Sequence, residues 1–302
     1  MSVTVLDPPA GRQGPGPIPQ QLIDALDLAV SRLVARTLPG DRRAAGVGLG
    51  TELAQLRPYE IGDDVRHIEP SATARTGQPH VRLHVPERAL TTWIVLDVSP
   101  SMAFGTARRL KADVAEGVAL VFGRLGVRRA GSLGLVTFGA PTARVLAPRG
   151  SKPGIVALRR ALAEGVARDG CRQPEALAHA VARTARLARQ PGLVVAISDF
   201  RDQRTWERPL GSLRMRHSVV AVEISDPREA QLPAAGHLAL VDPETGARIE
   251  VDTSRPRVRR RFAELERERR AQVARELRRL RVDHVALSTA DDWLPALGRH
   301  LR

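Results

Sequence analysis

Short apolar runs alternate along most of the chain with longer stretches in which apolar residues recur every three or four positions. Runs such as Trp93 to Leu96 are too short for helices and are typical of strands buried on both faces. Stretches with helical spacing, such as 107–125, lie between these runs. Strands that alternate with helices predict an α/β fold with a doubly wound, mostly parallel sheet, whose crossovers are right-handed.

The expected elements follow one another in a regular order. The predicted strands are 93–96, 131–139, 143–148, 192–200, 217–227 and 282–289. The predicted helices are 107–125, 153–164, 174–189 with Pro174 in its first turn, 206–213, 256–281 and a last helix ending near Leu301. Residues 143–148 are expected to form a hairpin with the preceding strand, and 238–251 are expected to form an inserted hairpin.

The first 90 residues have a different character and form a small N-terminal extension to the main domain, which is predicted to span 91–302. Residues 1–17 are rich in Pro and Gly and are interpreted as a mobile leader. Residues 18–37 have the pattern of an amphipathic helix that needs an apolar partner, which the main domain could provide. Residues 38–51 form a Gly-rich connection.

A polar segment and one further strand complete the predicted 1–90 extension. Val81, Leu83 and Val85 alternate with polar residues, which predicts a half-exposed strand. The polar segment before it contains Gly62, Asp63, Asp64, Arg66 and Arg75. Its spacing dictates no chemistry, so a solvated loop with ion pairs is the favoured interpretation.

Composition limits the possible classes of protein. A chain of 302 residues with 43% hydrophobic residues can bury a sizeable core. A single cysteine, Cys171, excludes an intramolecular disulfide. No apolar run approaches the roughly 18 residues needed to span a bilayer, so the expectation is a soluble, cytoplasmic protein with no membrane span.

The net charge of +14 gives only weak support for nucleic-acid binding. Of the 47 basic residues, only Lys111 and Lys152 are lysines. Such extreme use of arginine, beside abundant Ala and Gly, is as typical of coding bias as of a basic groove.

Candidate chemistry lies where the strand 93–96 ends, in the sequence WIVLDVSPSM. Asp97, Ser99 and Ser101 follow the apolar run, and ligands of open parallel sheets collect beyond the carboxyl ends of the strands. A carboxylate and two hydroxyls at alternate positions are suitable oxygen ligands for a hard cation such as Mg²⁺. The alternative is a turn in which these side chains satisfy their own backbone.

The segment LDVSPSM resembles the metal-ion-dependent adhesion site of von Willebrand factor A domains, with the motif Asp-x-Ser-x-Ser. Longer segments, including IGDDVRHIEPSATARTG, GLVVAISDF and EISDPREAQLPAAGHLALVDPETGARIEVDTS, resemble the bacterial family of unknown function numbered fifty-eight. The resemblance extends from about residue 57 to the C-terminus. It implies a von Willebrand factor A-like, Rossmann-like fold and an association with MoxR-type AAA+ ATPases.

The same resemblance implies that Asp199, which ends the strand 192–200, joins Asp97, Ser99 and Ser101 around Mg²⁺ or Mn²⁺. An acidic residue of a client protein would then supply the last ligand. The expected role is that of a non-catalytic adaptor in complex assembly or chaperoning. Without the resemblance, Asp199 is equally well explained as a cap or turn residue before the helix 206–213.

One departure from the adhesion-site pattern predicts weak metal affinity. Those domains usually add a threonine from a later loop, but no Ser or Thr lies between Asp169 and Ala178. Glu175 is a possible substitute, although an acid at a helix N-terminus is also explained by the helix dipole. Cys171 in this loop is predicted to be a small buried residue, because no His accompanies it.

Two rival functions follow from other features. The segment from Arg255 to Arg281 contains twelve arginines and four glutamates, which suggests a nucleic-acid or phosphate-binding helix at 256–281. Its apolar face favours a core-packing helix with a solvated charged side instead, so specific nucleic-acid binding is not expected. A metal-dependent hydrolase is less favoured still, because Ser99 stands where haloacid dehalogenase phosphatases place their general acid.

Overall fold

The computed structural model describes residues 11–37, 52–85, 90–128, 130–202 and 204–301. The chain divides into two compact units. The larger unit joins residues 1–38 to 90–302, and the smaller unit spans 39–89. The N-terminal helix thus belongs with the larger unit and not with residues 39–89.

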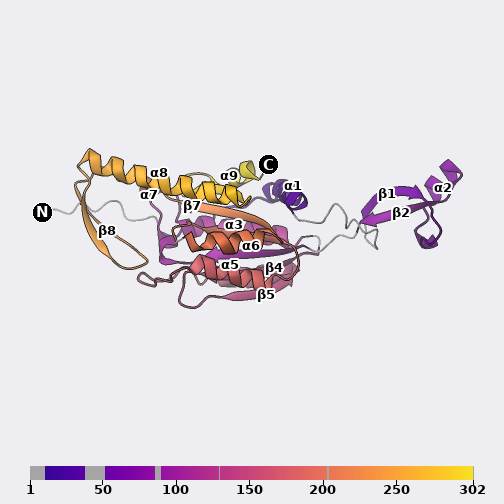
Figure 1. Cartoon of the computed structure of the whole chain (residues 1–302), viewed down its shortest axis with the longest axis horizontal. Coiled ribbons are helices and arrows are strands. Elements are labelled where there is room, and N and C mark those ends of the chain that lie inside the picture. The colour runs from indigo at the N-terminus through magenta and orange to yellow at the C-terminus, as the bar shows by residue number, and fades with distance from the viewer. Residues whose placement is uncertain (1–10, 38–51, 86–89, 129, 203, 302) are drawn as a thin grey trace. The chain divides into compact units, whose positions relative to one another are not determined.

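A six-stranded sheet forms the centre of the larger unit (Figure 1). Its strands are β3 (Thr91–Asp97), β4 (Ser132–Phe138), β5 (Val145–Gly150), β6 (Leu193–Ser198), β7 (Ser218–Ser225) and β10 (Asp283–Ser288). Their spatial order is β10-β7-β6-β3-β4-β5, and every neighbouring pair is parallel except β4 with β5. The predicted doubly wound, mostly parallel α/β fold and the hairpin at its edge are confirmed.

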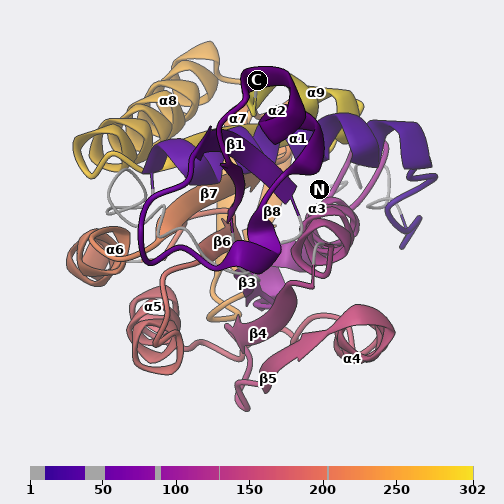
Figure 2. The same ribbon diagram turned by 90° about the vertical axis from the view of Figure 1, so that its right-hand side faces the viewer.

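Helices cover both faces of this sheet (Figure 2). They are α3 (Lys111–Gly126), α4 (Ser151–Leu162), α5 (Ala176–Leu187), α6 (Glu207–Arg214), the short α7 (Pro227–Ala230), α8 (Pro256–Arg279) and α9 (Trp293–His300). Alternate residues of β3 face opposite layers: Ile94 packs in one buried cluster and Trp93 in the other. Burial of both faces explains why the central strands read as unbroken apolar runs.

The amphipathic helix α1 (Gln20–Thr37) packs within the larger unit. Ile23, Leu26 and Val30 are buried in the same cluster as residues of α3 and α9. The main domain is therefore the partner that its apolar stripe requires.

Residues 11–17 are held against α3, so the prediction of a mobile leader is wrong for this part of the chain. The backbone N–H groups of Gln13 and Gly14 donate to the Asp113 carboxylate, at 3.1 and 2.9 Å. Arg12 pairs with Glu116 at 2.6 Å. Residues 1–10 of the predicted leader lie outside the described residues.

The smaller unit contains β1 (Glu52–Pro58), α2 (Pro70–Thr76) and β2 (His80–Val85). β2 confirms the strand predicted there, and it pairs antiparallel with β1, which the sequence pattern did not predict. Ion pairs order the polar segment between them: Arg57 contacts Asp63 at 2.7 Å, and the Arg66 side chain contacts Asp64 at 3.2 Å. The predicted connection 38–51 lies outside the described residues.

The inserted hairpin consists of β8 (His237–Val241) and β9 (Arg248–Asp252), which form an antiparallel sheet of their own. Figure 1 shows β8 standing away from the six-stranded sheet. Within the described part of the chain, no helix is both long and apolar enough to cross a membrane.

Candidate functional site

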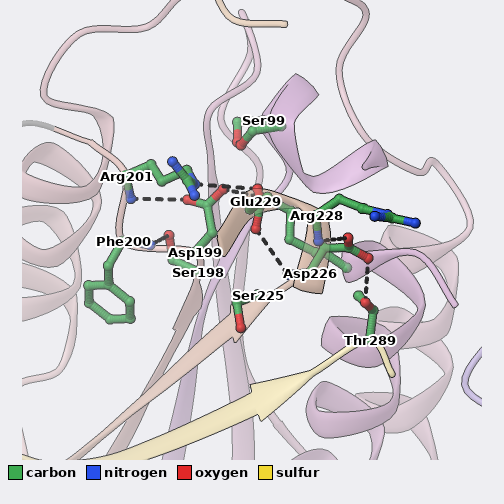
Figure 3. A network of polar contacts seen from close by, with 12 residues as sticks. Ser99, Ser198, Asp199, Phe200, Arg201, Ser225, Asp226, Arg228, Glu229 and Thr289 are labelled. Carbon is green, nitrogen blue, oxygen red and sulfur yellow. Dashed lines mark hydrogen bonds and ion pairs between the residues drawn. The ribbon is translucent and has the colours of Figure 1, made fainter. Parts of the chain in front are cut away.

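The carboxyl ends of β3, β6 and β7 lie side by side, and each ends in polar residues. Asp97 ends β3, Ser198 and Asp199 follow from β6, and Asp226 follows β7. Figure 3 shows the residues from β6 and β7, with Ser99 nearby. The expected neighbourhood of Asp97 and Asp199 arises because β3 pairs directly with β6.

Asp97 is buried, with 5% of its surface exposed, and both of its carboxylate oxygens accept a hydrogen bond. Oδ1 accepts the Ser99 backbone N–H at 2.9 Å, and Oδ2 accepts the Ser198 hydroxyl at 2.6 Å. The hydroxyl oxygens of Ser99 and Ser101 lie 3.0 Å apart. The bond from the Ser99 N–H to Asp97 is the one expected for the predicted alternative, a turn whose side chains satisfy its own backbone. The hydroxyls of Ser99 and Ser101 lie next to this turn.

Asp199 is paired with a lysine that the sequence analysis did not include in the site. Lys111 Nζ lies 2.7 Å from Asp199 Oδ2 and 2.6 Å from Glu229 Oε1, and Lys111 is fully buried. Burial alone would raise the pKa of Asp199, but the charge and hydrogen bond of Lys111 outweigh burial and hold that pKa below its usual range. Asp199 is thus already neutralised from within the chain.

Asp199 is not the N-cap of the helix that follows it. α6 begins at Glu207 with Trp206 as its N-cap. Asp199 Oδ1 instead accepts the Arg201 backbone N–H at 3.1 Å, as a turn residue does (Figure 3). Arg201 also reaches Glu229, at 3.3 Å.

Among the residues that the structure describes, no basic side chain is paired with Asp97. Burial, and then the negative charge of Asp199, raise the pKa of Asp97 to about 7, although Ser198 and Ser99 donate hydrogen bonds to it. The two neighbouring strand ends therefore differ: Asp199 has an ammonium group beside it, and Asp97 has only neutral donors.

A third carboxylate reaches this site from the inserted hairpin. Glu244, in the turn between β8 and β9, accepts the Ser101 backbone N–H through Oε1 at 3.1 Å. The adjacent carbonyl of Pro243 accepts the Gly170 N–H at 2.8 Å. Burial raises the pKa of Glu244, and the charge of Asp199 adds to this effect.

Asp226 organises the neighbouring strand end. Its carboxylate accepts the Thr289 hydroxyl at 2.5 Å and the Arg228 N–H at 2.9 Å (Figure 3). It also accepts the Thr106 hydroxyl at 2.6 Å. Burial would raise the pKa of Asp226, but these hydrogen bonds hold it below its usual range. Through Thr106, Asp226 anchors the loop before α3 to the end of β7.

Two other residues of the sequence analysis lie away from these contacts. Glu175 is the N-cap of α5, with a left-handed backbone (φ 56°), so the helix starts at Ala176 rather than at Pro174. Among the described contacts, none joins Glu175 to Asp97, Ser99 or Ser101. Cys171 is partly exposed, so the prediction that it is buried is wrong.

The donor set fits a hard divalent cation in its chemistry. Asp97, Ser99 and Ser101 offer only oxygen atoms, which are the ligands that Mg²⁺ and Mn²⁺ prefer. No three His, Cys, Asp or Glu side chains are arranged to hold a metal ion among the residues that the structure describes. A cation here would thus depend on the two hydroxyls as well as on Asp97.

Lys111 and Glu244 are the site residues that sequence reasoning missed. Lys111 had a signal, since it is one of only two lysines in an arginine-rich chain. Glu244 had none, because an acid in a hairpin turn is ordinary and its contact spans 143 positions.

Comparison with solved structures finds distant similarities. A conserved hypothetical protein, BatB from Bacteroides thetaiotaomicron, is 13% identical and matches 70% of this chain and 97% of its own, with a TM-score of 0.43. The VWA domain of SpRpn10 is 16% identical and matches 45% of this chain and 76% of its own, with a TM-score of 0.33.

Sequence comparison gives nearer relatives. The uncharacterised protein Rv1480 of Mycobacterium tuberculosis is 37% identical over 275 residues, which is 91% of this chain and 86% of the relative. The model of the family described as "Protein of unknown function DUF58" matches residues 55–272. The match covers more than half of the chain, which therefore belongs to the DUF58 family.

Proposed function

We propose that this chain is a protein-interaction module that binds a divalent cation, Mg²⁺ or Mn²⁺, at the ends of β3 and β6. Asp97, Ser99 and Ser101 would hold the cation, and Asp199 would contribute to its outer surroundings. The observation that supports this proposal is the unequal charge of the two strand ends. Lys111 is paired with Asp199, whereas the described contacts of buried Asp97 are with neutral donors.

Such a site is suited to recognition of an acidic residue of another protein. Ser99 and Ser101 carry no charge, so a cation held by them and Asp97 would keep a net attraction for an external carboxylate. The family resemblance suggests a MoxR-type AAA+ ATPase and its client as partners, and hence an adaptor role in complex assembly. The proposed role is one of binding rather than catalysis, in keeping with the resemblance to von Willebrand factor A domains.

Calorimetric titration of Mg²⁺ and Mn²⁺, extended to millimolar concentrations, tests the proposal. Asp97→Asn keeps the shape of the side chain and removes its charge, so it should abolish binding while far-ultraviolet circular dichroism is unchanged. Asp291→Asn is the matched control, because Asp291 is exposed and follows β10 at the far edge of the sheet order. Equal binding by the parent and Asp97→Asn would overturn the cation site.

Capture of a purified MoxR-type ATPase tests the partner. Ser99→Ala should weaken the complex in Mg²⁺, and EDTA should reproduce that loss in the parent protein. The two losses should not add, because both act through one contact. A complex that survives both treatments would refute cation-mediated recognition.

A further inference from the structure

The turn between β8 and β9 is tied together by one aspartate. Asp242 Oδ1 accepts the Glu244 N–H at 3.0 Å, and Asp242 Oδ2 accepts the Thr245 hydroxyl at 2.5 Å. The Asp242 carbonyl accepts the Gly246 N–H at 2.8 Å. These bonds fix the backbone from which the Glu244 side chain projects.

Among the described residues, two hydrogen bonds donated by backbone N–H groups hold this turn in place. One joins Glu244 to Ser101 and the other joins Pro243 to Gly170, at 3.1 and 2.8 Å. Among the described strands, β8 and β9 pair with each other and not with the six-stranded sheet. Much of their surface is exposed, including 60% of Ile249, so the contacts of the turn matter for where the hairpin lies.

Glu244 lies beside the residues that are proposed to bind the cation. Its Oε1 contacts the backbone of Ser101, whose hydroxyl is one of the proposed cation ligands. The carboxylate is partly buried, in a site that already contains Asp97 and Asp199. Four acids (Asp97, Asp199, Glu229 and Glu244) lie in this network with two cations, Lys111 and Arg201. The excess of negative charge favours a further cation, since a concentration of like charge is unfavourable in a poorly solvated site.

We propose that Glu244 is an internal acidic ligand of this site. The proposal rests on the proposed function and deepens it: the hairpin turn occupies the position of a partner's carboxylate, and a partner binds by displacing it. Glu244 also supplies an oxygen ligand in a site whose loop offers no Ser or Thr between Asp169 and Ala178.

Binding of Mn²⁺ to the full chain, followed by electron paramagnetic resonance, tests Glu244 as a ligand. Glu244→Gln should lower the affinity for Mn²⁺ by about tenfold or more, as loss of groups around a bound metal commonly does. Glu250→Gln is the matched control, because it removes the same charge from an exposed position on β9. Added acetate, as a substitute for a partner's carboxylate, should restore affinity in Glu244→Gln and leave the parent unchanged.

Hydrogen exchange in EDTA tests the docked turn without any metal. Glu244→Ala should accelerate exchange in peptides that cover 237–252, and Glu250→Ala should not. Unchanged exchange in Glu244→Ala would overturn the docked turn.

The outcomes separate the two proposals. Failure of the parent to bind Mn²⁺ overturns the proposed function, and with it Glu244 as a cation ligand. Mn²⁺ binding that is equal in the parent and in Glu244→Gln overturns only the internal ligand and leaves the cation site standing.

Discussion

A single buried ammonium group sets the charge balance of the candidate site. Lys111 lies at the first position of α3 and contacts two acids from other parts of the chain, Asp199 and Glu229. Burial would lower the pKa of Lys111, but the two carboxylates more than compensate and raise it. The ammonium form is therefore a permanent part of this strand end.

Replacing Lys111 by Met should destabilise the fold strongly. The change leaves Asp199 and Glu229 without their counter-charge in a buried place, and removing one partner of a buried pair typically costs about 3–5 kcal/mol. The free energy of unfolding, measured by urea denaturation, should fall by that amount. Lys152→Met is the control, because Lys152 is exposed, and equal stability of the two variants would contradict the assigned role.

At the scale of elements, the pattern of apolar residues was sufficient to predict most helices and strands of the larger unit. Strands buried on both faces, such as β6, leave continuous apolar runs that have few other interpretations. β1 escaped prediction because its sequence, ELAQLRP, carries neither an apolar run nor strict alternation. β1 forms a strand because it pairs with β2, and this tertiary contact cannot be read from the local sequence.

The site was less predictable than the fold, for a related reason. Asp97, Ser99 and Ser101 are close in sequence, and their approach follows from one strand and one turn. The pair of Lys111 and Asp199 spans 88 positions and depends on α3 packing over β6. Contacts of that kind can be predicted only when the order of the strands in the sheet is known, and the periodicity of the sequence does not give that order.

The helix α1 should contribute substantially to the stability of the larger unit. Ile23→Ala removes a fully buried side chain from the cluster shared with α3 and α9, and such truncations cost about 2–5 kcal/mol. Leu28→Ala, on the same helix, should change stability little, because 54% of Leu28 is exposed. Thermal unfolding of both variants measures the difference, and similar midpoints would argue against a docked α1.

At the scale of the whole molecule, the net charge of +14 overstates the basic surface that α8 offers. Arg269 pairs with Glu266 at 2.9 Å, and Arg270 donates to Ser225 at 2.6 Å. Arg279 pairs with Glu276 at 2.6 Å. These arginines are held by groups of the chain itself, which reduces their availability to phosphates.

Binding to duplex DNA or RNA should accordingly be weak and nonspecific at about 0.15 M salt, where charges more than about 8 Å apart are largely screened. Filter binding over a series of salt concentrations provides the measurement. The affinity should fall steeply as salt rises, since only counterion release would drive it. Sub-micromolar binding at about 0.15 M salt that is insensitive to EDTA would favour the arginine-rich helix over the cation site.

Because Lys111 is buried, amine-reactive reagents should distinguish between the two lysines of the sequence. Lys152 is the other lysine of the sequence and is exposed on α4, so acylation under native conditions should modify Lys152 in preference to Lys111. A fluorophore could thus be attached to one known side chain without mutagenesis. Reaction at Lys111 would require the end of β6 to open, and its acylation, followed by mass spectrometry, would report the rate of that opening.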